Sequence, residues 1–147
     1  MIRIIIWSGL LNFQQPEDPL IIRDETGAQT LLGYVVDLQE DKAQCHLEIG
    51  PQHGNRHGGL HGGIMACLLD NAMGYAAALE FDKGGRPTVA TLSMTTNFLA
   101  PARGGRVTAQ GAVSGGGRST LFTTGELIDA EGRVLATATG VYKRIKA

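Results

Sequence analysis

The sequence lacks a charge excess of either sign, a cysteine framework and internal repeats. Thirteen basic residues oppose 14 acidic ones and the pI is about 6.4, so no basic surface predicts a nucleic-acid or membrane partner. The two cysteines, Cys45 and Cys67, are 22 positions apart with no CxxC pair, which argues against a disulfide scaffold or a zinc site. This cysteine usage favours the reducing cytoplasm.

The N-terminal run MIRIIIWSGLL is too short to span a bilayer, and no small-x-small cleavage pattern follows it. We expect residues 1–30 to form an N-terminal extension whose structure the pattern does not specify. The chain has 147 residues, of which 43% are hydrophobic, which suffices for one packed domain. We therefore predict a single domain over residues 1–147.

Hydrophobic periodicity predicts two strands, a long helix and four more strands. Residues 31–38 and 43–49 are expected to form an antiparallel hairpin. Residues 64–79 include only three that are not apolar, which favours a helix buried on every side. The remaining strands are predicted between Pro87 and Pro101 and at 106–113, 119–128 and 133–142. This order predicts an α+β hotdog fold, in which a curved antiparallel β-sheet wraps around a long central α-helix.

Two sets of side chains alternate along the strand after Pro87. The set expected to face the core is Ala90, Leu92, Met94 and Phe98. The set expected to face outward is Thr91, Ser93, Thr95 and Asn97. This alternation places Thr91 opposite the core face.

Asp70 is the main candidate for chemistry, because a carboxylate seldom lies inside an apolar helix unless it is paired or used. No basic residue lies within a helical turn of it, so a local ion pair is not available. A structural alternative is that Asp70 hydrogen-bonds a neighbouring backbone group. We favour a functional role.

Gly62 and Gly63 begin the predicted helix, where free N–H groups and the positive end of the helix dipole can hold a carbonyl oxygen or an oxyanion. Asp70 follows eight residues later, about 12 Å along the helix, so one carbonyl cannot touch both groups of the same chain. Two copies with antiparallel helices would bring the carboxylate of one to the helix start of the other. The sequence therefore predicts a twofold homodimer with two equivalent sites.

The stretch NRHGGLHGGI at residues 55–64, followed by LLDN at 68–71, closely resembles the HGG signature of the PaaI-like thioesterases of the hotdog superfamily. The resemblance continues at residues 91–101 and in the final hairpin, and covers about 31–144. It implies an acyl-CoA thioesterase that hydrolyses an aryl or short- or medium-chain acyl-CoA to free acid and CoA. No cofactor is expected, since coenzyme A is part of the substrate.

The resemblance also implies roles for individual residues. Asp70 would be the nucleophile or the general base, and the Gly62 N–H would donate to the thioester carbonyl. Asn55 and His61 would line the site and orient substrate or water, and Thr91 would position water. The resemblance further suggests that two dimers associate into a tetramer.

Basic loop residues often contact the phosphates of coenzyme A in similar enzymes, which makes Arg118 and Ser119 candidates for CoA binding. They follow three consecutive glycines, and the alternative is an ordinary solvated hairpin tip. Arg103 and Arg106 are weaker candidates.

Three other functions compete with hydrolysis. The histidines at 53, 57 and 61 have a spacing that suits metal binding on a helix, but the glycines around them oppose a helix, and we predict no metal site. A non-catalytic acyl-CoA sensor would keep the pocket and could lose the carboxylate, so Asp70 favours catalysis. A hotdog dehydratase or hydratase would pair a catalytic histidine with an acidic residue in other motifs, which are not seen here.

Overall fold

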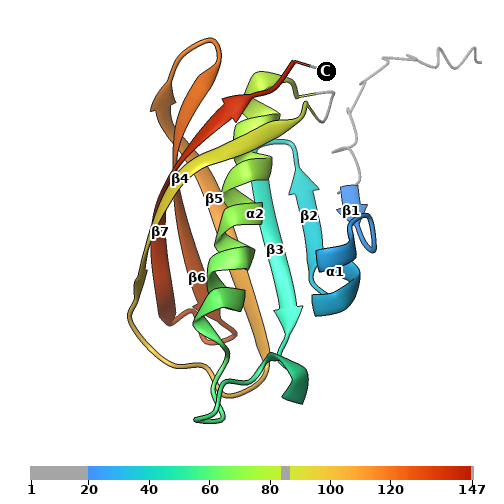
Figure 1. Cartoon of the computed structure of the whole chain (residues 1–147), viewed down its shortest axis with the longest axis vertical. Helices are drawn as coiled ribbons and strands as arrows, with labels where there is room; N and C mark the ends of the chain where they lie inside the picture. The colour runs from blue at the N-terminus through green and yellow to red at the C-terminus, as the bar shows by residue number, and fades with distance from the viewer. Residues whose placement is uncertain (1–19, 84–86, 147) are drawn as a thin grey trace, which may run out of the picture.

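The computed structural model describes residues 20–83 and 87–146. A long helix, α2 (Gly62–Phe81), lies in the concave side of a seven-stranded antiparallel sheet ordered β1-β2-β3-β5-β6-β7-β4 (Figure 1). The strands are β1 (Leu20–Ile22), β2 (Val35–Gln39), β3 (Lys42–Glu48), β4 (Val89–Phe98), β5 (Arg106–Gly116), β6 (Thr120–Asp129) and β7 (Val134–Arg144). Two short helices, α1 (Gly27–Leu32) and η1 (Pro51–His53), complete the described elements. This is the predicted α+β hotdog fold.

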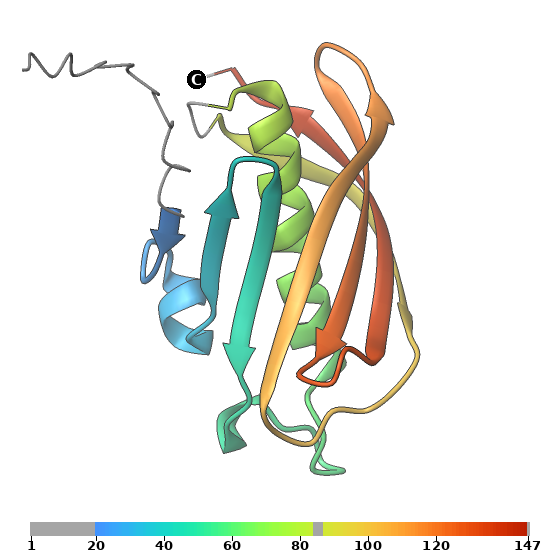
Figure 2. The same ribbon diagram turned by 180° about the vertical axis from the view of Figure 1, so that it is seen from behind.

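The sheet and α2 approach closely where both carry small residues. In the view from behind, β5 passes in front of the helix, with β3 on one side of it and β6 on the other (Figure 2). A Cβ atom at Gly111 of β5 would collide with the backbone carbonyl of Ala72, so the strand backbone rests directly on the helix backbone. The largest fully buried side chains of α2 at this interface are Leu68, Leu69 and Met73.

The helix is not buried on every side, contrary to the sequence prediction. The sheet of a single chain wraps around only part of the helix. The side that it leaves half-buried is a stripe formed by Ile64, Cys67, Asn71 and Tyr75. By length and composition α2 could cross a membrane, but within the described residues it is the core helix of this sheet. This partly exposed stripe, which is apolar apart from Asn71, can pack against another surface.

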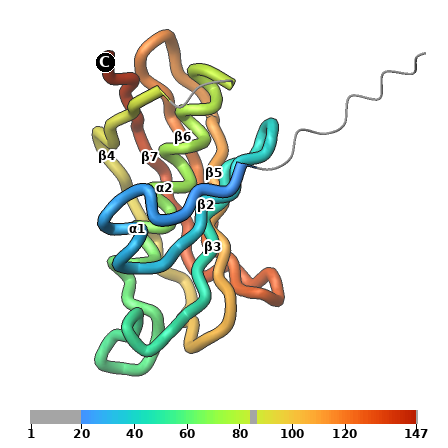
Figure 3. Tube along the Cα trace, turned by 90° about the vertical axis from the view of Figure 1, so that its right-hand side faces the viewer, coloured from blue at the N-terminus to red at the C-terminus, as the bar shows by residue number. Residues whose placement is uncertain are grey.

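The first predicted strand begins too early. Residues Gly27–Leu32 form α1, because Thr26 Oγ1 accepts a hydrogen bond from the Gln29 N–H at its start and Gly33 ends it with φ 75°. Of the predicted extension 1–30, Leu20–Ile22 add β1 to the sheet edge, and α1 lies beside β2 (Figure 3). Residues 1–19 lie outside the described part of the chain.

The predicted inward and outward faces of β4 are wrong at its beginning. Thr91 pairs with Tyr142 of β7, but Ser93 pairs with Val141, so Leu92 is an extra residue in a β-bulge. The bulge reverses the alternation: Thr91 faces the helix, and Leu92 is 57% exposed. Met94 remains half-buried against the core, as predicted.

Candidate active site

Two hydroxyl groups hold the carboxylate of Asp70. Tyr142 donates a hydrogen bond of 2.8 Å to Asp70 Oδ1, and Thr91 donates one of 2.8 Å to the same oxygen. The Tyr142 hydroxyl also lies 3.1 Å from the backbone oxygen of Asp70. All the described partners of this carboxylate are side-chain hydroxyls, so Asp70 does not cap a backbone N–H group.

Tyr142 is a residue of this candidate site that the sequence pattern did not reveal. Its side chain is 1% exposed, and burial, followed by the nearby charge of Asp70, raises the pKa of its phenol well above the ordinary value. The hydroxyl therefore stays protonated and remains a donor. An aromatic residue at an inward strand position is typical of a core, and the contact joins residues 72 positions apart, so no local signal pointed to it.

Asp70 opens onto a cavity of about 600 Å³ beside the helix. The helix contributes Asn71, Gly74 and Tyr75 to its wall, and β4 contributes Thr91. Tyr75 packs against the core and also lines this cavity. A cavity of this size can enclose a small organic group next to the carboxylate.

The start of α2 has a free N–H group. His61 precedes the helix, and its Nδ1 accepts a hydrogen bond of 2.9 Å from the Gly63 N–H. Among the residues that the structure describes, none accepts a hydrogen bond from Gly62. Because Gly62 and Asp70 lie on the same straight helix, the single chain does not bring them together.

Asn55 shapes the loop that leads to Gly62. Its Oδ1 accepts hydrogen bonds from the His57 N–H at 2.9 Å and the Gly59 N–H at 3.2 Å. These contacts turn the glycine-rich loop back toward the helix. The side chain thus has a local structural role in the single chain, and its predicted contact with substrate stays a prediction.

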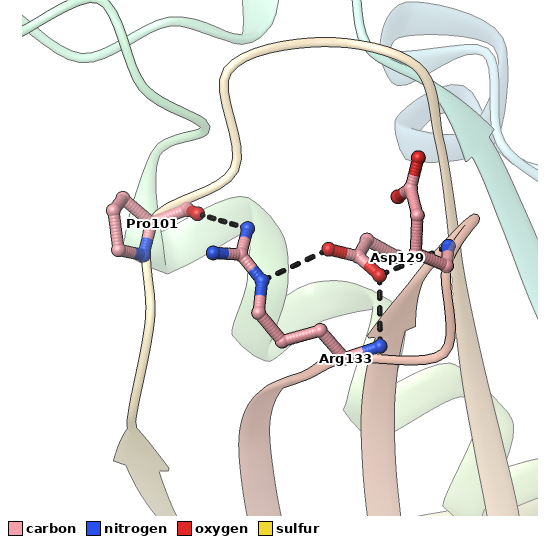
Figure 4. A network of polar contacts seen from close by, with 4 residues as sticks. Pro101, Asp129 and Arg133 are labelled. Atoms are coloured by element: carbon pink, nitrogen blue, oxygen red, sulfur yellow. Dashed lines mark hydrogen bonds and ion pairs between the residues drawn. The ribbon is translucent and has the colours of Figure 1, made fainter.

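A second loop supports the glycine-rich loop. Leu60 donates a backbone hydrogen bond of 2.7 Å to the carbonyl of Ala102. The neighbouring Pro101 carbonyl accepts a hydrogen bond of 3.1 Å from Arg133, whose Nε also pairs with Asp129 Oδ2 at 3.0 Å (Figure 4). The turn after β6 therefore anchors the loop on which the start of α2 rests.

The three histidines serve different structures and do not converge. His53 is buried, with Nδ1 accepting from the Gly50 N–H and Nε2 lying 2.8 Å from the Leu32 carbonyl oxygen. His57 is exposed, and His61 caps α2. No group of three or more possible metal ligands occurs within residues 20–83 and 87–146.

The two residues predicted to bind CoA, Arg118 and Ser119, lie in different environments. Arg118 lines a cavity of about 510 Å³ between the end of α2 and the glycine-rich turn after β5, together with Arg144. Ser119 is exposed, and its carbonyl accepts a hydrogen bond from the Arg144 N–H. Two guanidinium groups outnumber the single carboxylate in the lining, that of Glu80, which suits the cavity to an anionic ligand.

Comparison with known families identifies the chain's relatives. The model of the thioesterase superfamily matches residues 57–136, which is more than half of the chain. The chain belongs to the thioesterase superfamily. This superfamily protein has no significant match among curated proteins.

Solved structures of similar fold include PaaI of Escherichia coli, from the phenylacetic acid degradation operon, at 25% identity and TM-score 0.74, with 84% of this chain and 87% of PaaI covered. A Bacillus halodurans protein solved with CoA shares 25% identity at TM-score 0.76, over 86% of this chain and 83% of that one. A Haemophilus influenzae thioesterase at 24% identity and TM-score 0.75, over 83% and 85% of the two chains, supports the fold alone.

Proposed function

We propose that this protein hydrolyses an aryl or short- or medium-chain acyl-CoA to free acid and CoA, at a site shared by two subunits. The observation that carries the proposal is the arrangement of Asp70. Its Oδ1 is held by two hydroxyl groups, and the residue opens onto a cavity of about 600 Å³. Membership of the thioesterase superfamily supports the reaction class.

The chemistry needs a polarised carbonyl and an oxygen nucleophile. The free Gly62 N–H, at the positive end of the α2 dipole, would donate to the thioester oxygen and stabilise the oxyanion. Asp70 would either attack the carbonyl carbon and form a mixed anhydride, which water then hydrolyses to the free acid and the regenerated carboxylate, or remove a proton from a water that attacks the carbonyl carbon. In both routes CoA leaves as the thiolate, so little acid assistance is needed.

Two subunits are required because Gly62 and Asp70 are about 12 Å apart on one helix. Two surfaces of the single chain support association. The edge strand β4 pairs with β7 on one side, and no strand of the described chain lies on the other. Three apolar side chains are 56–61% exposed there: Leu92 and Phe98 in β4, and Leu99 directly after it. The half-buried stripe of α2 is also available. A homodimer accounts for both, and its doubling into a tetramer is an expectation from the family resemblance.

Other groups would assist binding. Asn55 and His61 of the partner subunit's loop would approach the same thioester, since they flank Gly62. Arg118 would meet phosphates of CoA, an assignment supported by its shared cavity with Arg144 and by the CoA held in the Bacillus halodurans structure. No metal or further cofactor is needed by this scheme. Both cysteines are free, which supports a reducing compartment such as the cytoplasm.

Thiol release from a panel of aryl, short-chain and longer acyl-CoA esters tests the function, with Asp70→Asn beside the wild type. We expect Asp70→Asn to lower kcat by about three orders of magnitude or more while the protein stays folded, because the carboxylate reacts in either route. Full activity of Asp70→Asn would contradict the mechanism. Tight binding without turnover by the wild type would favour the sensor.

A further inference from the structure

The Asp70 carboxylate has one restrained oxygen and one free oxygen. Both hydroxyl donors, from Tyr142 and Thr91, bond Oδ1. Oδ2 has no partner among the described residues, and it is not one of the buried unpaired side-chain atoms, so it is open to the cavity. The two oxygens of this carboxylate are therefore not equivalent.

We propose that Tyr142 is a positioning residue that acts, with Thr91, to fix Oδ1 and so makes Oδ2 the oxygen that meets the thioester or the attacking water. The inference rests on the proposed hydrolysis. A carboxylate held by two hydrogen bonds on one oxygen cannot rotate freely, which removes an orientation cost from the reaction. The hydroxyls are neutral, so the negative charge of Asp70 is not cancelled by a cation.

Two glycines, Gly74 and Gly140, lie against the ring of Tyr142. A Cβ atom at Gly140 would lie 2.7 Å from Cε2 of Tyr142, and one at Gly74 would lie 3.4 Å from Cε1. Glycine inside a strand and inside a helix each costs stability relative to alanine. At position 140 the Tyr142 ring leaves no space for a side chain, so the ring can occupy its observed position because residue 140 is glycine.

The bulge in β4 supplies the second donor. If Leu92 were paired regularly with β7 instead of bulging, alternation from Met94 would turn Thr91 away from the helix and Leu92 toward it. The observed register exposes a leucine and brings a hydroxyl to Asp70, an exchange that the hydrophobic effect alone does not favour. Because Thr91 donates its proton to Oδ1, its lone pairs remain available to accept a hydrogen bond from a water next to Oδ2.

Tyr34 provides a matched control inside the same protein. It is 4% exposed, burial raises the pKa of its phenol, and its hydroxyl donates to Asn71, the neighbour of Asp70 on α2. The two tyrosines thus share burial and a bond to α2. They differ in the acceptor on α2: Tyr142 donates to the Asp70 carboxylate, whereas Tyr34 donates to the Asn71 amide oxygen.

The test compares Tyr142→Phe and Tyr34→Phe with the wild type, using the panel ester that gives the highest kcat/KM. We expect Tyr142→Phe to lower kcat roughly 10- to 100-fold, since a hydrogen bond to a charged group is lost. KM should stay within about twofold, because the carboxylate acts in the transition state and not in ground-state binding. Tyr34→Phe should keep kcat within about threefold of the wild type.

A second pair of variants covers the case in which Tyr142→Phe does not fold. Thr91→Ser keeps the hydroxyl and should keep most of kcat, whereas Thr91→Val should lose about tenfold. In an Asp70→Asn background, adding Tyr142→Phe should change the residual rate by less than about twofold, because the partner of the hydroxyl is already altered.

Three results would overturn the inference: an unchanged kcat for Tyr142→Phe, an equal loss for Tyr34→Phe, or, where Tyr142→Phe does not fold, equal activity of Thr91→Ser and Thr91→Val. Its failure is distinguishable from failure of the proposed function. An inactive Asp70→Asn with an active Tyr142→Phe would reject the positioning role alone. An active Asp70→Asn would reject the hydrolytic mechanism itself.

Discussion

The partners of Asp70 differ from those of three acids that form ion pairs with lysine or arginine. Asp41 pairs with Lys83 at 2.9 Å, Glu48 with Arg106 at 2.8 Å and Asp129 with Arg133 at 3.0 Å. Those carboxylates face cations that neutralise them. Asp70 faces two neutral hydroxyls, which orient the group and leave its charge available to a substrate.

The environment of His46 leads to a prediction of how the free energy of unfolding depends on pH. Burial, and then the charge of Arg106, lowers the pKa of its imidazole, while Asp37 acts in the opposite direction. The unfolded chain therefore binds this proton at a higher pH than the folded chain does. The free energy of unfolding should fall as pH drops through the ordinary histidine value of 6.5.

Chemical denaturation of the wild type and His46→Gln at about pH 7.5 and 5.5 measures this dependence. The wild type should lose more stability between the two conditions than His46→Gln does. Equal losses in the two proteins would show that protonation of His46 does not drive the change.

Among the secondary-structure elements, those with long and regular patterns were predictable from sequence. The run of apolar residues gave α2, and alternation together with turn residues gave β3, β5, β6 and β7. Helix α1 was missed because six residues are too few for a periodic signal, and its start depends on one hydrogen bond to Thr26.

The site was predictable in part, for a related reason. Asp70 was singled out because it interrupts an apolar helix, and Gly62 because it begins the helix. The contact of Thr91 depends on a bulge, and that of Tyr142 on the pairing of distant strands. Neither feature has a signature within a short stretch of sequence.

The contact between β5 and α2 gives an element-level prediction. Gly111→Ala should destabilise the fold by about 1–3 kcal/mol, because the new methyl group would force the strand away from the Ala72 backbone. Gly115→Ala is the matched control in the same strand, since a Cβ there meets nothing within 4 Å. Urea denaturation compares the two, and equal stabilities would contradict the close approach.

On the scale of the whole molecule, the proposed site divides its two halves between subunits. This division can be tested by removing each half in a different chain. Asp70→Asn removes the carboxylate, and Gly62→Pro removes the N–H group at the first helical position, where proline is tolerated. Each homodimer then lacks one half of every site.

Mixed dimers of these two variants should regain activity. Random association makes half of the dimers mixed, and each mixed dimer has one intact site of two, so we expect about a quarter of wild-type activity. The measurement is thiol release after the two proteins are unfolded together and refolded. If the mixture stays as inactive as the separate variants, the two groups do not act across a subunit boundary.

The bulge at Leu92 also affects how β4 is compared between relatives. A homologue with one residue fewer at this point would bring its hydroxyl residue to the carboxylate through an uninterrupted strand. A correct alignment of the two sequences would then contain a one-residue gap at Leu92. Without that gap, every assignment on one side of it would be transferred to the wrong position, and engineering of substrate contacts along this strand would begin from misplaced residues.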